Sequence, residues 1–159
     1  MPSDPQKDPQ QAPPKPPQKA AAGRQDRDLA FELLARVPYG RVATSMRALP
    51  FLASARHIVT DGRLLLRMHR GLGYHEACIG SVVAYGADNL GQERPEDAGQ
   101  WSVQCVGTCE QVEPTTADLE LFGPAPQYAD DEPFDPVYLH VAPQFVTVHE
   151  LRGGSAQRS

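Results

Sequence analysis

The chain has 159 residues, of which 40% are hydrophobic, and a formal net charge of −5. This length fits one domain, or one domain with a tail, and the acidic balance argues against a nucleic-acid-binding protein. No stretch is apolar for long enough to form a membrane span or the core of a signal peptide.

The three cysteines predict neither a disulfide framework nor a zinc site. Cys105 and Cys109 lie in a predicted strand, which separates them by roughly 13 Å at about 3.3 Å per residue, too far for a disulfide. No Cys-x-x-Cys pair occurs, so no metal site is predicted. Unpaired cysteines are typical of the reducing cytoplasm, where we expect this protein.

The N-terminal stretch is rich in proline, glutamine and lysine and cannot bury enough apolar surface to fold. We predict a disordered tail over residues 1–27, a folded domain over 28–151 and a frayed end over 152–159. At the start of the domain, Asp28 is a plausible N-cap, and the apolar residues after it predict a short helix to about residue 36.

Three strands are predicted next, over residues 41–46, 51–59 and 63–69, with a break at residues 47–50. Asp61-Gly62 between the last two is a strong signal for a type I′ hairpin. Its register places Arg56 opposite Arg67 and Ser54 opposite His69, all on one face. Two facing arginines indicate either a solvated surface pair or an anion site, for which a phosphate fits the guanidinium fork. His57 faces the other side and is expected to be a half-buried structural residue.

The remaining pattern predicts a helical turn over 74–78, a strand over 80–85, a long loop over 86–100 and a long strand over 101–112. Gly107 in that strand indicates a bulge or a close approach. The domain is completed by a predicted helix over 114–122 and an acidic loop over 123–136. A last strand pair is predicted over 137–151, with an interruption at Ala142-Pro143. We predict a mainly β (α+β) fold, a six-stranded antiparallel barrel with short flanking helices. A small barrel is filled by its own side chains, so a ligand must bind outside it, most naturally at a subunit interface.

Several motifs in this order resemble the split β-barrel flavin-binding proteins of the pyridoxamine 5′-phosphate oxidase-like superfamily. They are Gly40-Arg41-Val42-Ala43-Thr44, the Asp-Gly hairpin, Met68-His69-Arg70-Gly71 and the strand from Trp101 to Thr108. The first motif and His69 are most similar to the nitroimidazole-resistance subgroup. The resemblance implies a homodimer with FMN in two interfacial clefts. It also implies an oxidoreductase that acts on a small molecule, with a nicotinamide cofactor as electron donor.

The hairpin register and the resemblance together predict site residues. His69 is the candidate catalytic residue. The candidate cofactor-binding residues lie on the hairpin, in the glycine loop after it and on the long strand: Ser54, Arg56, Arg67, His69, Arg70, Tyr74, His75 and Gln104. The subgroup usually has a Gly-Lys pair after its histidine, whereas here the stretch is Gly71-Leu72-Gly73. Relatives bind a deazaflavin or haem instead, and His140 or His149 could ligate a haem iron. A non-catalytic module that works through the proline-rich tail is the other alternative.

Overall fold

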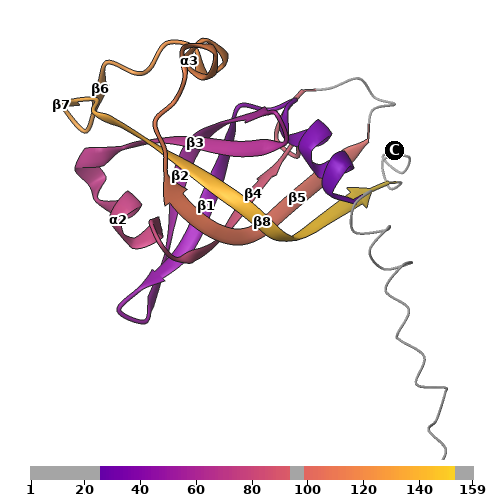
Figure 1. Ribbon diagram of the computed structural model, residues 1–159. Coiled ribbons are helices and arrows are strands. Elements are labelled where there is room, and N and C mark those ends of the chain that lie inside the picture. The colour runs from indigo at the N-terminus through magenta and orange to yellow at the C-terminus, as the bar shows by residue number, and fades with distance from the viewer. Residues whose placement is uncertain (1–25, 94–98, 153–159) are drawn as a thin grey trace, which may run out of the picture.

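A computed structural model describes residues 26–93 and 99–152 (Figure 1). The predicted tail over 1–27 therefore lies almost wholly outside the described residues, as does 153–159 in the predicted frayed end. A helix covers residues 26–34. The elements after it are β1 (Tyr39–Met46), β2 (Leu49–Thr60), β3 (Arg63–His69), the 3-10 turn η1 (Arg70–Leu72), α2 (Tyr74–Cys78), β4 (Val82–Asp88), β5 (Gln100–Gln111), α3 (Thr116–Phe122), β6 (Tyr128–Ala129), β7 (Glu132–Pro133) and β8 (Pro136–Leu151).

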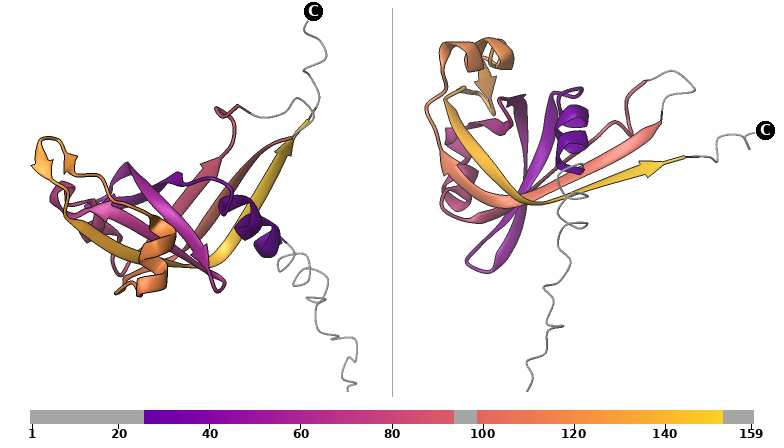
Figure 2. Two further views of the ribbon diagram at one scale, coloured as in Figure 1. Left: turned by 90° about the horizontal axis from the view of Figure 1, so that it is seen from above. Right: turned by 45° about the vertical axis from the view of Figure 1, so that its right-hand side comes forward.

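Six strands close into an antiparallel barrel in the order β1-β2-β3-β8-β5-β4. The predicted mainly β barrel with short helices is thus confirmed. β5 and β8 are the longest pair in the barrel, and Figure 2 shows their far ends projecting together beyond it. The β6–β7 hairpin and α3 lie on the β3 side (Figure 1). No helix in the described part of the chain is long and apolar enough to cross a membrane.

The predicted hairpin between β2 and β3 has the expected turn, and its register is as expected from Thr60 to Arg56, whereas the predicted pairing of Ser54 with His69 is not part of the ladder. Asp61 and Gly62 have φ values of 51° and 71°, the positive values that a type I′ turn requires. Arg56 pairs with Arg67, and Thr60 with Arg63. The bulge or close approach predicted at Gly107 is present, because the register of β5 with β8 shifts between Val106 and Gly107, and the extra residue of the bulge is Gln144 of β8. A Cβ at Gly107 would overlap the carbonyl group of Ala142.

Three details of the prediction are wrong. Asp28 lies inside the first helix rather than at its N-cap, since residues 26 and 27 are already helical. The break predicted over residues 47–50 is shorter, because only Arg47 and Ala48 lie between β1 and β2, in a turn with φ values of 54° and 70°, and β2 begins at Leu49. The last strand pair is one continuous strand, β8, since a bulge at Gln144, next to Pro143, shifts the register with β5 without ending the ladder.

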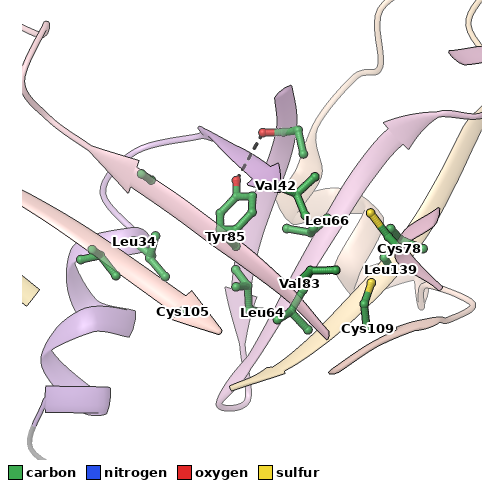
Figure 3. Close-up of a cluster of buried hydrophobic side chains, with 14 of the residues drawn as sticks. Leu34, Val42, Leu64, Leu66, Cys78, Val83, Tyr85, Cys105, Cys109 and Leu139 are labelled. Carbon is green, nitrogen blue, oxygen red and sulfur yellow. Dashed lines mark hydrogen bonds between the residues drawn. The ribbon is translucent and has the colours of Figure 1, made fainter. Parts of the chain in front are cut away.

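Apolar side chains from all six strands fill the barrel, together with those of the first helix (Figure 3). Tyr85 is fully buried among them, and its hydroxyl oxygen lies 2.5 Å from Nδ1 of His57. Nε2 of His57 lies 2.9 Å from the carbonyl oxygen of Leu34. His57 is 1% exposed, so it is a structural residue as predicted, but fully rather than half buried. All three cysteines are buried free thiols.

A smaller apolar cluster holds α3 against the outer side of the barrel. Ile58 of β2 and Leu65 of β3 face outward and are covered by Phe122, the last residue of α3. Thr115 caps this helix through a reciprocal pair of hydrogen bonds with Asp118, which fixes where the helix begins. The outer face of β2 and β3 is therefore closed to solvent at this end.

Candidate functional site

Two rows of outward-facing residues cross five neighbouring strands of the barrel. One row, which we name the apolar row, consists of Leu52, Ala43, Ala84, Val106 and Phe145, each paired with the next across β2, β1, β4, β5 and β8. The adjacent row, which we name the polar row, consists of Ser54, Arg41, Gly86, Gln104 and Thr147. Side chains two residues apart on a strand share a face, so the two rows lie side by side.

A cleft of about 750 Å³ lies on this outer wall. All five residues of the polar row line it, together with Leu52, Ala43 and Ala84 of the apolar row. The middle of its floor is made of small residues, because Ala43 pairs with Ala84 and Arg41 pairs with Gly86. The cleft agrees with the expectation that a filled barrel leaves only its outside for a ligand.

Two of the predicted cofactor-binding residues meet in this cleft. Ser54 comes from β2 and Gln104 from β5, and both are exposed. Asp88, Ser102 and His149 lie next to one another on β4, β5 and β8 and also line the cleft. One carboxylate oxygen of Asp88 accepts a hydrogen bond from the backbone N–H of Leu90 at 2.9 Å.

Arg41 lies between Ser54 and Gly86 in the polar row. It is exposed and lines the cleft. Within residues 26–93 and 99–152, its guanidinium group has no hydrogen bond or ion pair. Arg41 was not among the predicted site residues.

The two facing arginines, Arg56 and Arg67, lie under α3 and not in the cleft. Arg56 donates hydrogen bonds to the carbonyl oxygens of residues 38, 57 and 121. Arg67 is 5% exposed and donates to the carbonyl oxygens of Gly123 at 2.9 Å and Pro124 at 3.3 Å. Burial, and then the charge of Arg67, lowers the pKa of Arg56. The pair is thus neither a solvated surface nor an open anion site, although Nε of Arg67 has no partner among the described residues.

His69 holds the segment that follows β7. Its Nδ1 accepts a hydrogen bond from the backbone N–H of Asp135 at 3.0 Å, and its ring stacks on Phe134. The proton of the neutral ring is therefore on Nε2, which lies 3.8 Å from a carboxylate oxygen of Glu132. His69 is 6% exposed and does not line the cleft.

The other predicted residues lie in η1 and α2 and also outside the cleft. Arg70 forms an ion pair with Asp135 at 3.5 Å. The ring of Tyr74 stacks on Phe51, with 5.0 Å between the centroids. His75 is buried, and its Nδ1 has no partner in the part of the chain that the structure describes. Of the eight predicted residues, Ser54 and Gln104 thus reach the cleft and the other six do not.

Sequence reasoning missed most of the cleft, including Tyr39, Arg41 and Asp88. The alternation of side chains in Gly40-Arg41-Val42-Ala43 indicates that Arg41 and Ala43 share a face, which was an available signal. Their neighbours in space come from β4, β5 and β8, and that pairing is not visible in local sequence. Among the described residues, no group of three or more metal-binding side chains is arranged to hold a metal ion.

Comparison with known proteins identifies relatives of this fold. The uncharacterized protein Rv0080 of Mycobacterium tuberculosis is 38% identical over 92 residues, which is 55% of this chain and 59% of that protein. The chain therefore spans about three fifths of the length of that curated relative. Among solved structures, the FAD binding protein from Mycobacterium smegmatis has a TM-score of 0.57 and 24% identity, covering 79% of this chain and 96% of the other.

Two further structures share the fold at lower identity. The putative pyridoxamine 5′-phosphate oxidase from Corynebacterium glutamicum has a TM-score of 0.58 and 21% identity over 81% of this chain and 92% of the other. The FAD and heme binding protein from Mycobacterium smegmatis has a TM-score of 0.58 and 16% identity over 80% and 72%. The pyridoxamine 5′-phosphate oxidase family model matches residues 26–152, a range that includes all of the described residues. The chain belongs to the pyridoxamine 5′-phosphate oxidase family.

Proposed function

We propose that this chain binds FMN in the outer-wall cleft, where two copies of the chain meet, and acts as a flavin-dependent oxidoreductase on a small molecule. The observation that carries the proposal is the cleft of about 750 Å³ on the outside of a filled barrel. That volume lies within the range of about 300–1,000 Å³ that ligand and cofactor sites usually have.

The residues of the cleft fit a planar ring with polar edges. Ala43, Ala84 and Gly86 form a low floor on which a flat ring system can lie. Ser54 and Gln104 lie beside this floor and offer a hydroxyl and an amide group for hydrogen bonds to ring heteroatoms. A bound flavin would supply electron transfer, for which a nicotinamide cofactor is the proposed donor.

A second copy of this chain is the proposed cover of the cleft. The apolar row runs along the cleft and ends in two large exposed side chains, Leu52 at 59% and Phe145 at 68% exposure. Contiguous exposed apolar surface of this kind marks an interaction site. A two-fold dimer is the commonest soluble assembly, and it would bury the same row of both copies.

His69 has a different place in this proposal from the one that the sequence predicts. Since Nδ1 of His69 is bound to the backbone of Asp135 and the ring does not line the cleft, we expect it to position residues 132–135. We therefore propose Ser54 and Gln104 as cofactor contacts and His69 as a positioning residue.

The test is the absorbance spectrum of the purified full-length chain, followed by titration with FMN. We expect the bands of an oxidised flavin, or quenching of flavin fluorescence to one FMN per chain. Reduction of the bound flavin by a nicotinamide cofactor then tests the proposed donor. Absence of flavin binding at concentrations far above micromolar would contradict the proposal.

Haem is a second candidate because His149 is exposed and lines the cleft, and imidazole is a common ligand of haem iron. A Soret band that disappears in His149→Ala would support haem over flavin. A deazaflavin would instead show its own spectrum on titration. A chain that binds none of these cofactors would fit a non-catalytic interaction module.

A further inference from the structure

Nearly every arginine in the described residues has a polar partner. Nine arginines lie in residues 26–93 and 99–152, and seven of them contact a backbone carbonyl or a carboxylate. The paired ones are Arg27, Arg36, Arg56, Arg63, Arg67, Arg70 and Arg152. Arg41 and Arg47 are the two that remain, in the part of the chain described here.

The two unpaired arginines differ in their surroundings. Arg47 lies in the exposed turn between β1 and β2, where water surrounds its charge. Arg41 lies in the cleft, beside the hydroxyl group of Ser54 on one side and Gly86, which has no side chain, on the other. The guanidinium group of Arg41 is therefore free to meet a ligand in the cleft.

We propose that Arg41 binds the phosphate group of the flavin nucleotide, an inference that rests on the proposed function above. A guanidinium group presents parallel N–H donors that match the oxygens of a phosphate. Ser54, its partner on β2, can donate a hydroxyl hydrogen bond to the same phosphate. Arg56 and Arg67 are excluded from this role because their donors already bind carbonyl groups around α3.

The charges that line the cleft agree with this assignment. Among the described residues that line the cleft, Arg41 is the one arginine or lysine and Asp88 is the one carboxylate. Asp88 lies two residues after Gly86 on β4, and one of its carboxylate oxygens accepts a hydrogen bond from the backbone N–H of Leu90. An anion is thus attracted toward Arg41 and repelled from Asp88, which orients the nucleotide in the cleft.

The experiment compares FMN with riboflavin, which has the same ring system but no phosphate. Equilibrium dissociation constants of both are measured by fluorescence titration for the full-length chain and for Arg41→Ala. We expect Arg41→Ala to weaken FMN binding about ten- to a hundredfold and to leave riboflavin binding unchanged. Arg41→Lys should keep part of the difference, since it keeps the charge but loses the fork.

Arg47→Ala is the matched control, because Arg47 is also unpaired among the described residues but lies outside the cleft. This substitution should change neither the FMN nor the riboflavin dissociation constant. Equal loss of FMN and riboflavin binding in Arg41→Ala, or no loss of either, would overturn the inference. If Arg41→Ala dissociates the dimer in sedimentation, Arg41 pairs with the second copy and the inference is also wrong. Failure of the unaltered chain to bind either flavin contradicts the proposed function itself, which separates the two failures.

Discussion

Arg56 and Arg67 stand opposite each other on β2 and β3, and both guanidinium groups lie over the ring of Phe122, at 5.9 and 5.3 Å from its centroid. Two facing positive charges ordinarily repel. Here the last carbonyl groups of α3 and of the turn after it accept their hydrogen bonds, and the ring face attracts both cations. The arginine pair therefore fastens α3 to the barrel.

The first prediction follows from this contact. Arg67→Ala removes two charge-assisted hydrogen bonds and the cation–ring contact of a 5% exposed side chain. The free energy of unfolding should fall by about 2–4 kcal/mol, measured by urea denaturation. Arg47→Ala, which removes an exposed arginine, should change it by less than about 0.5 kcal/mol. An unaltered stability in Arg67→Ala would show that the pair does not hold α3.

The second prediction concerns pH and His57. The pKa of His57 is lowered from 6.5. Burial is the largest cause and the charge of Arg56 lowers the pKa further, whereas the hydrogen bonds to the backbone partly oppose this shift. The neutral ring then donates from Nε2 to Leu34 and accepts at Nδ1 from the hydroxyl of Tyr85.

The unfolded chain takes up a proton on this ring near pH 6.5, whereas the folded chain does so only at a lower pH. The stabilisation is therefore complete above about pH 6.5 and is lost as the pH falls toward the folded pKa. Urea denaturation from about pH 7 to about pH 5 should show this loss, and His57→Gln should reduce it. His140→Gln is the control. Burial is also the largest cause that lowers the pKa of His140, but this side chain is only half-buried, so its replacement should change the pH dependence of the unfolding free energy less.

The third prediction tests the close approach of Gly107 in β5 to the bulged strand β8. Gly107→Ala places a Cβ where the carbonyl group of Ala142 already lies, and the backbone of β8 cannot move away without breaking the ladder. We expect a loss of about 3 kcal/mol or more in the free energy of unfolding. Gly91→Ala, where nothing lies within 4 Å of the added Cβ, is the control and should be near neutral. Equal stability of the two variants would contradict the close approach.

The sequence predicted the features that depend on local chemistry. Asp61-Gly62 defined a turn, and the turn fixed which residues of β2 and β3 face one another, including Arg56 and Arg67. The sequence did not predict the turn at Arg47-Ala48, because neither residue favours the positive φ that both adopt there. Tertiary pairing of β1 with β2 imposes that turn.

The candidate site was harder to predict for the same reason. Ser54 and Gln104 were identified and do lie in the cleft, but Arg56 and Arg67 were assigned to a ligand that they are not free to hold. Both arginines donate to carbonyl groups of α3 and of the turn after it. The packing of α3 against β2 and β3 is a long-range contact that no local sequence pattern predicts. Arg41 was missed because its neighbour Gly86 comes from a strand more than forty residues away.

The fourth prediction tests the cleft without disturbing the barrel. A Cβ at Gly86 would meet only the carbonyl oxygen of Val103, at 3.5 Å, so a larger side chain fits and points into the cleft. Gly86→Leu should therefore fold normally and bind FMN at least tenfold more weakly, measured by fluorescence titration. Gly91→Leu is the control outside the cleft. Unchanged binding in Gly86→Leu would place the flavin elsewhere on the molecule.

The last prediction tests whether a second copy covers the apolar row. Leu52 and Phe145 end this row and are among the most exposed apolar side chains of the described residues, so a dimer that buries them gains the free energy of removing both from water. If the dimer buries the apolar row, Leu52→Glu would place an unpaired carboxylate in the interface. Burial of an unpaired charge costs free energy and should therefore weaken the dimer.

Sedimentation velocity at low micromolar concentration should thus show a dimer for the unaltered chain and a monomer for Leu52→Glu, with Phe145→Glu behaving alike. Leu119→Glu is the control, since Leu119 is exposed on α3, outside the apolar row. A dimer that survives both substitutions in the row would show that the copies associate through another face. A dimer lost in Leu119→Glu as well would point to α3 instead.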